Sequence, residues 1–154
     1  MKRIALIAVG GAALIGAALY AFTKGSAETD RVVLQNSDPA IVSLGASVYE
    51  ANCASCHGAD LEGQANWRSP DEDGRLPAPP HDETGHTWHH DGDTLFQLTK
   101  YGVGALINDP GYASNMPIYD SVLSDEEIIA VLSYIKSTWP EEIRARHTEM
   151  ENRQ

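Results

Sequence analysis

Two cysteines and a histidine stand in one pentapeptide, Cys53-Ala54-Ser55-Cys56-His57, and no other cysteine occurs in the 154 residues. Two thiols at this spacing can each form a thioether with a haem vinyl group, and the adjacent histidine can bind the iron as its proximal ligand. A thioredoxin-like redox pair is expected within a βαβ pattern, which is absent here, and a zinc knuckle needs a second ligand pair. The motif therefore predicts one covalent c-type haem held by Cys53, Cys56 and His57.

Met116 is the best candidate for the second axial ligand of this iron, which His57 alone would leave with one open position. It lies in the loop Ser114-Asn115-Met116-Pro117-Ile118-Tyr119, whereas Met1 and Met150 stand near the two ends of the chain. A thioether ligand raises the reduction potential because the soft sulfur favours ferrous iron. Two alternatives stay open. A lone methionine often only fills space in a core, and a histidine in its place would give bis-histidine iron of lower potential.

A helix is predicted directly before the haem motif. Asp38 can serve as its N-cap and Pro39 as its first residue, and apolar residues recur at helical spacing from Ile41 to Ala51. Gly45 lies in the middle of this helix, where a glycine costs about 1 kcal/mol relative to alanine. Its presence indicates that another helix approaches closely at this point.

Two further helices are predicted in the second half of the chain. One opens at Asp91-Gly92-Asp93 and stops at Gly102. The other opens with the capping box Ser124-Asp125-Glu126-Glu127 and ends at Trp139-Pro140. The long segments between the helices have no periodicity, which a haem would explain, because a loop can pack against a porphyrin. No strand pattern appears, so the predicted fold class is all-α.

Four histidines stand within ten residues of the loop that follows the motif. They are His81, His86, His89 and His90. At this density they could form a second metal site for copper or zinc. The alternative is that Trp88 and one or two of the histidines pack around the haem edge or its propionates, while the others are solvated or cap the next helix. Arg68 could likewise pair with a propionate or lie in a surface loop.

The N-terminus predicts export from the cytoplasm. Lys2 and Arg3 precede an uncharged run over residues 4–22, and this run is close to the ~20 residues that cross a bilayer. An uncleaved anchor is favoured over a signal peptide cut after Ala27, and both place the remainder of the chain outside. Covalent haem attachment in bacteria is completed on that side. The expected location is therefore the bacterial inner membrane with the haem domain in the periplasm, or the soluble periplasm after cleavage.

The charge of the chain is strongly acidic. The formal net charge is −11, and residues 28–154 hold eight basic and all 22 acidic side chains, which gives −14. Nucleic acid and anionic lipid surfaces are therefore excluded as expected partners. A protein partner steered by charge should present a basic face, and the alternative is that the charge serves solubility alone.

Residues 38–139 resemble the small monohaem class I cytochromes c. In that family the first helix carries a glycine and, four residues on, an aromatic residue, as Gly45 and Tyr49 do here. It leads into the C-x-x-C-H motif, and a Met-Pro pair in the last loop, here Met116-Pro117, supplies the sixth ligand. The last helix crosses the first and carries an aromatic residue, for which Tyr134 fits.

The resemblance implies a further contact of the proximal histidine. In the family, the carbonyl group of a loop proline accepts a hydrogen bond from this histidine, and here Pro79 fits best, with Pro80 possible. It also implies the class I cytochrome c fold, in which three main helices surround a covalent haem, here with an added N-terminal apolar helix. The chain divides into a membrane anchor or signal peptide (1–27), a tether (28–37), a haem domain (38–139) and a charged tail (140–154).

The implied function is one-electron transfer without catalysis. The expected protein is a membrane-attached bacterial carrier with His/Met-ligated iron. Its expected partners are a quinol-oxidising complex and a terminal oxidase or reductase. Two alternatives stay open. One is a haem protein whose residues 81–90 form a second metal site for copper handling or peroxidase-like chemistry, and the other is a fixed haem subunit of a larger oxidoreductase.

Overall fold

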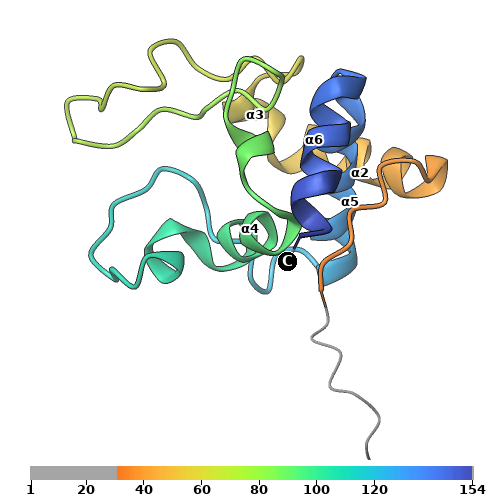
Figure 1. Ribbon diagram of the computed structural model, residues 1–154. Helices are drawn as coiled ribbons and strands as arrows, with labels where there is room; N and C mark the ends of the chain where they lie inside the picture. Colours follow the sequence, from red (N-terminus) through yellow and green to blue (C-terminus); the bar gives the residue numbers. More distant parts are fainter. Residues whose placement is uncertain (1–30, 154) are drawn as a thin grey trace, which may run out of the picture. The chain divides into compact units, whose positions relative to one another are not determined.

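The computed structural model describes residues 31–153, and within them it contains helices and loops but no strand (Figure 1). The elements are α2 (Pro39–Asn52), α3 (Ala54–His57), the 3-10 turn η1 (Thr87–His89), α4 (Gly92–Leu106), α5 (Asp125–Thr138) and α6 (Glu141–Glu151). The predicted all-α class is confirmed. The predicted anchor or signal peptide, 1–27, lies outside the described residues. None of the helices described here has the length and apolar character that a membrane crossing requires.

Helix α2 begins and ends where its sequence predicts. The Asp38 carboxylate accepts hydrogen bonds from the backbone N–H groups of Ala40 (2.8 Å) and Ile41 (3.3 Å), and Pro39 occupies the first turn. The backbone then passes through Cys53 into the single turn of α3, where the His57 N–H donates to the Cys53 carbonyl oxygen at 2.9 Å. The haem motif is thus built on a continuous run of helical turns.

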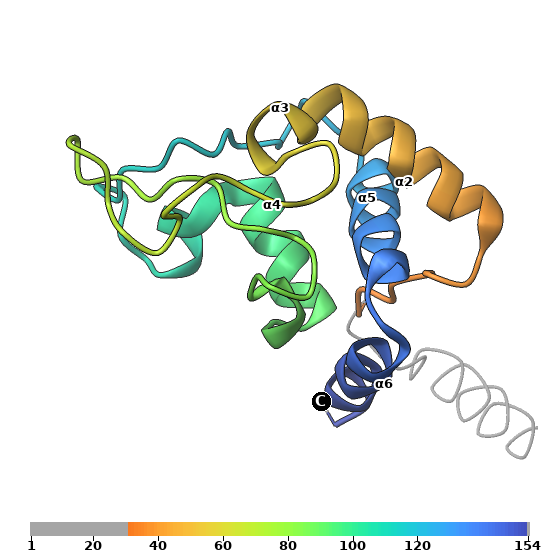
Figure 2. The same cartoon turned by 90° about the horizontal axis from the view of Figure 1, so that it is seen from above.

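Helices α2 and α5 cross in close contact, as Figure 2 shows. A Cβ atom added to Gly45 would collide with the carbonyl group of Ala130 on α5, so only glycine fits at the crossing. One turn along, the rings of Tyr49 and Tyr134 pack with centroids 5.5 Å apart. This confirms the helix approach predicted from Gly45.

Helices α4 and α5 also follow their local signals. The Asp91 carboxylate caps α4 by accepting from the Thr94 N–H at 2.8 Å. The predicted stop at Gly102 is a break, because this residue has a φ of 82° and one more helical turn follows it to Leu106. The predicted capping box of α5 is confirmed, since the side chains of Ser124 and Glu127 each accept from the other's backbone N–H.

One apolar core joins these helices to the segments on both sides. Its buried members are Leu34, Val48, Tyr49, Leu61, Leu95, Phe96, Ile128, Val131, Leu132, Ile135 and Trp139. Most of them come from α2, α4 and α5, which are the three main helices that the resemblance implies.

Residues 32–35, which belong to the segment expected to be a tether, pack against the domain. Leu34 lies in the core and is 6% exposed. The Val32 N–H donates to a carboxylate oxygen of Asp93 (2.8 Å), and the Gln35 N–H donates to the Ser133 hydroxyl (2.9 Å). These contacts make residues 32–35 part of the domain, because their apolar and backbone groups find partners on α4 and α5.

The charged tail forms α6 and packs against the turn η1. His147 is 1% exposed, and its Nε2 lies 2.8 Å from the His90 carbonyl oxygen. The Lys136 ammonium group, 2% exposed, pairs with the Glu151 carboxylate at 2.7 Å. This charged segment thus forms a helix that is held largely by buried polar groups.

Candidate haem-binding site

The two thiols of the motif are free and differ in burial. Cys56 is exposed, whereas Cys53 is half-buried and packs against the apolar core. Burial, with a smaller effect of Cys56, raises the pKa of the Cys53 thiol to about 11. Cys53 is the cap residue of α3 and Cys56 lies within this helix, so the two uncrosslinked thiols stand three residues apart at a single helical turn.

The imidazole of His57 is buried and held at one nitrogen. Its Nδ1 lies 2.9 Å from the Pro79 carbonyl oxygen, which can only accept, so Nδ1 carries the proton. The lone pair of Nε2 is then available to a metal ion. Burial lowers the pKa of His57, although the bond to Pro79 opposes the shift, so the ring is neutral as a ligand must be.

Pro79 is placed by backbone contacts of the loop that follows the motif. The Gly63 N–H donates to the His57 carbonyl oxygen (2.7 Å), and the Gln64 N–H donates to the Ala78 carbonyl oxygen (2.8 Å). Gly63 has a φ of 67° and lies against the backbone of residues 78–80, where a side chain would collide. The Tyr49 hydroxyl donates to the Gly58 carbonyl oxygen at 2.8 Å and fixes the start of the loop.

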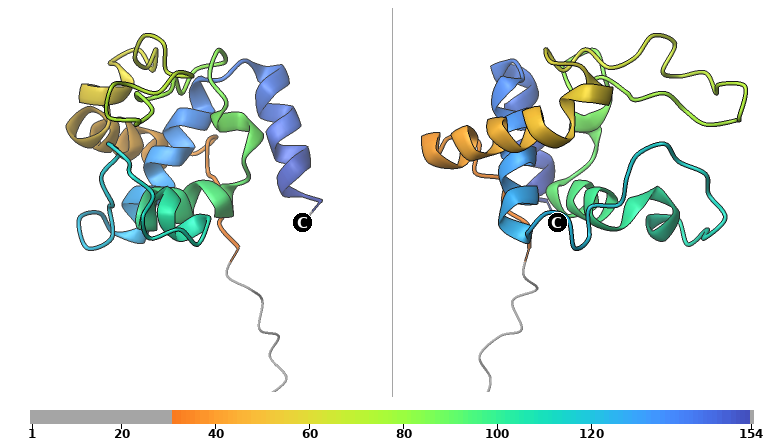
Figure 3. Two further views of the ribbon diagram at one scale, coloured as in Figure 1. Left: turned by 90° about the vertical axis from the view of Figure 1, so that its left-hand side faces the viewer. Right: turned by 180° about the vertical axis from the view of Figure 1, so that it is seen from behind.

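Met116 is half-buried in the loop between α4 and α5. This loop is fastened beside the motif, because the Tyr119 hydroxyl donates to the carbonyl oxygen of Asn52 at the end of α2 (2.7 Å). It also meets the other long loop, where the Arg75 guanidinium donates to the Asn115 side-chain oxygen at 2.8 Å. Figure 3 shows both loops projecting from the same side of the helices.

Trp88 and Arg68 have partners that the sequence did not predict. The ring of Trp88 stacks on that of His89 with centroids 3.7 Å apart, and it also packs against the apolar core. The guanidinium carbon of Arg68 lies 3.9 Å from the centroid of the Trp67 ring, in an exposed cation–π contact.

The four histidines of the loop do not converge on one point. The His81 ring stacks on that of His57, the His86 ring on that of Trp67, and the His89 ring on that of Trp88. Over residues 31–153 no group of three or more His, Cys, Asp or Glu side chains is arranged to hold a metal ion. Of the four, His86 and His90 contact each other edge-on with ring centroids 5.7 Å apart, whereas His81 and His89 lie against other aromatic rings.

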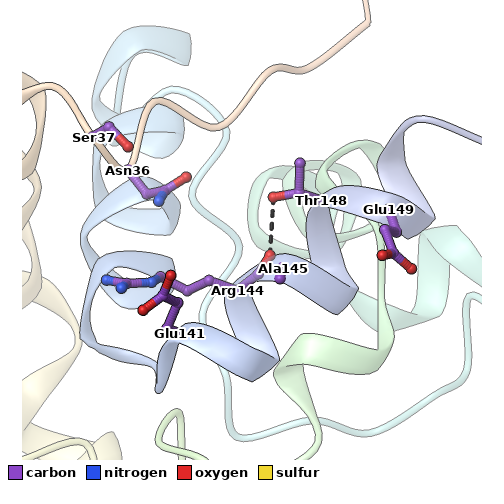
Figure 4. A pocket seen from close by; sticks show the side chains of 7 residues that line it. All are labelled: Asn36, Ser37, Glu141, Arg144, Ala145, Thr148 and Glu149. Carbon is purple, nitrogen blue, oxygen red and sulfur yellow. Dashed lines mark hydrogen bonds between the residues drawn. The ribbon is translucent and has the colours of Figure 1, made fainter.

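A pocket lies on a different part of the domain, between residues 36–37 and α6 (Figure 4). Its lining residues are Asn36, Ser37, Glu141, Arg144, Ala145, Thr148 and Glu149. None of the predicted site residues belongs to it, so it does not bear on the haem motif.

Comparison with known families decides the identity of the fold. Residues 42–139 match the family model described as cytochrome c. The chain belongs to the cytochrome c family. As a cytochrome c it carries a covalent c-type haem and transfers electrons.

Two curated relatives of this cytochrome c are oxidase subunits. It is 27% identical over 96 residues to the cbb3-type cytochrome c oxidase subunit FixP of Sinorhizobium medicae, covering 62% of this chain and 29% of the relative. It is 30% identical over 105 residues to the cbb3-type cytochrome c oxidase subunit CcoP of Rhodobacter capsulatus, covering 67% of this chain and 31% of the relative. The cytochrome thus spans less than a third of either relative. No solved structure matches it significantly.

The residues present fit a c-type haem. Two free thiols stand three residues apart at a single helical turn, and the adjacent His57 keeps Nε2 available because Nδ1 is occupied. Large apolar side chains are exposed on both projecting loops, which suits an apolar porphyrin. They include Leu76 on the first loop, Leu106 at the end of α4, and Ile107 and Ile118 on the second loop.

Sequence reasoning missed three positions around the motif. They are His81 against the His57 ring, Arg75 bridging to Asn115, and Tyr119 bonded to Asn52. The tyrosine could have been noticed, because it follows Met116 by three residues and ends the same loop. The other two involve partners 24 and 40 residues apart, for which no local pattern exists.

Proposed function

We propose that this cytochrome is a one-electron carrier whose haem iron is held by His57 and Met116. The observation that carries the proposal is the 2.9 Å contact between His57 Nδ1 and the Pro79 carbonyl oxygen, which leaves Nε2 as a neutral donor. The bound haem supplies the redox chemistry, because its iron takes up and releases a single electron.

The side chains of the protein provide attachment, orientation and closure. Cys53 and Cys56 would hold the porphyrin covalently, and the Pro79 carbonyl would increase the basicity of the His57 ligand. Met116 would occupy the remaining axial position, so that no position is left for a substrate. The bonds from Tyr119 to Asn52 and from Arg75 to Asn115 support this assignment, because they restrain the loop on both sides of Met116.

We propose a membrane-bound location and a terminal oxidase as one partner. The two relatives are named as subunits of cbb3-type oxidases, which supports a terminal oxidase as a partner. A quinol-oxidising complex would be the electron donor, and a terminal reductase is the alternative acceptor. A tether to the membrane would keep the carrier at a high effective concentration near such complexes.

A second candidate function is that of a fixed haem subunit in an oxidase. The names of the two relatives favour it, since both belong to assemblies. Purification of the full chain from membranes separates the two candidates. A fixed subunit co-purifies with its assembly at constant stoichiometry, whereas a carrier is recovered apart from its partners.

The absorption spectrum of the oxidised, haem-loaded protein tests the axial ligands. A weak long-wavelength band of sulfur-to-ferric-iron charge transfer is expected in the wild type and should be lost in Met116→Ala. The substitution Met150→Ala is the matched control and should keep the band. A wild type without the band would exclude Met116 as ligand and point to bis-histidine or open iron.

A further inference from the structure

A second imidazole lies directly against the proximal histidine. The rings of His57 and His81 are stacked, with centroids 4.1 Å apart and planes inclined by 20°. His57 is buried at 7% exposure, so this stack covers one face of its ring inside the protein. The His57 ring cannot turn about its Cβ–Cγ bond without pushing His81 aside.

His81 is itself held at its ring and at its backbone. Its Nδ1 lies 2.8 Å from the hydroxyl of buried Thr87, and its ring meets the Tyr49 ring edge-on at 6.3 Å. Its backbone N–H donates to the Leu61 carbonyl oxygen (2.8 Å), and its carbonyl oxygen accepts from Trp139 Nε1 (2.7 Å). The His81 ring that faces His57 is therefore held in a fixed position.

We propose that His81 is a positioning residue for the proximal ligand. The inference rests on the proposed role of His57 as iron ligand. The Pro79 carbonyl restrains His57 within the plane of its ring, and the His81 ring restrains it perpendicular to that plane. Together the two contacts fix the rotation of the ring, so that Nδ1 keeps its hydrogen bond and Nε2 keeps its direction.

The stacking of His81 on His57 has a predictable effect on the reduction potential. A hydrogen bond from Nδ1 increases the basicity of the imidazole and so favours ferric iron. Without the stacked His81 ring, His57 can rotate and its hydrogen bond to Pro79 can lengthen. The imidazole then becomes less basic and a weaker electron donor to the iron. Loss of the stack should therefore raise the midpoint potential and change the angle of the ligand plane.

The chemistry of His81 distinguishes positioning from simple core filling. An aliphatic side chain would fill the same space, whereas this flat ring is oriented by a polar bond to Thr87. The neighbouring His89 offers a matched control, because it is exposed and stacks on Trp88.

The test compares haem-loaded His81→Leu, His81→Phe and His89→Leu with the wild type. The readouts are the midpoint potential and the proton shifts of the haem methyl groups in the oxidised protein, which depend on the orientation of the axial ligand plane. His81→Leu should raise the potential and redistribute the methyl shifts. His81→Phe keeps a flat ring and should change the midpoint potential and the methyl shifts less than His81→Leu does. His89→Leu should match the wild type.

Each outcome decides the proposal. A folded His81→Leu protein with the wild-type methyl shifts and potential would overturn it. If His81→Leu does not fold, Thr87→Val replaces it, since this variant removes only the bond that orients His81, and unchanged shifts there would also overturn the proposal. An error in the ligand assignment is seen separately, because the wild type would then lack the shifted resonances of a coordinated imidazole.

Discussion

At the scale of single residues, the potential of this cytochrome depends on which atoms face the iron. Met116 is the proposed sulfur ligand, and axial ligands are among the strongest determinants of haem potential. Met116→Ala should therefore lower the midpoint potential by more than about 100 mV. Redox titration of the haem-loaded protein measures the change, with Met150→Ala as the control that leaves it unaltered. An unchanged potential in Met116→Ala would contradict the assignment.

At the scale of elements, the crossing of α2 and α5 holds the motif in place. Gly45→Ala would put a methyl group into the Ala130 carbonyl and force the two helices apart. We expect the free energy of unfolding to fall by about 2 kcal/mol or more, as overpacking does in cores. Ser47→Ala on the exposed face of the same helix should change it by less than about 0.5 kcal/mol. Denaturant unfolding of the haem-loaded variants compares them, and equal stabilities would show that the crossing tolerates a larger residue.

The docking of α6 gives a second prediction at this scale. Glu151→Gln would leave the Lys136 ammonium group, 2% exposed, without its carboxylate. The free energy of unfolding should fall by about 3 kcal/mol, because an unpaired charge stays buried. Glu149→Gln is the control, since its pair with Arg153 is exposed and contributes little. A loss no larger than in this control would mean that the buried pair does not hold α6.

The same pair should make the stability depend on pH. Burial raises the pKa of Glu151, but the nearby His147 and Lys136 outweigh it and bring the pKa below the usual 4.5. A carboxylate with a lowered pKa contributes its full stability above 4.5 and loses it as the pH falls through the folded-state value. The wild type should therefore lose more stability than Glu151→Gln on acidification below pH 4.5. Parallel pH profiles of unfolding would contradict this.

At the scale of the whole molecule, charge should decide how quickly partners meet the domain. Residues 28–154 hold eight basic and 22 acidic side chains. A small cationic redox reagent should exchange electrons with the haem-loaded protein more slowly as salt is added, by roughly tenfold between low and physiological ionic strength. An anionic reagent should show the opposite trend. If the stopped-flow rates with both reagents do not change with ionic strength, the acidic surface serves solubility alone.

The sequence by itself determined those features that depend on neighbouring residues. The haem motif occupies five consecutive positions, and the caps at Asp38 and Ser124 act on residues two or three positions further on. Gly45 and the helical periodicity were sufficient to predict a second helix at the crossing, because they reflect one face of one element. These signals led to the all-α class and to the cytochrome c family.

Only the tertiary structure decided which distant side chains surround the motif. The contact of His57 with Pro79 spans 22 residues, Val32 reaches Asp93 over 61, and His147 reaches His90 over 57. The four loop histidines looked like one cluster in the sequence, yet three of their rings stack on three different aromatic residues, and only His86 and His90 contact each other. Such contacts depend on the path of irregular loops, which has no periodicity to read and is settled by packing and by buried hydrogen bonds formed across the whole domain.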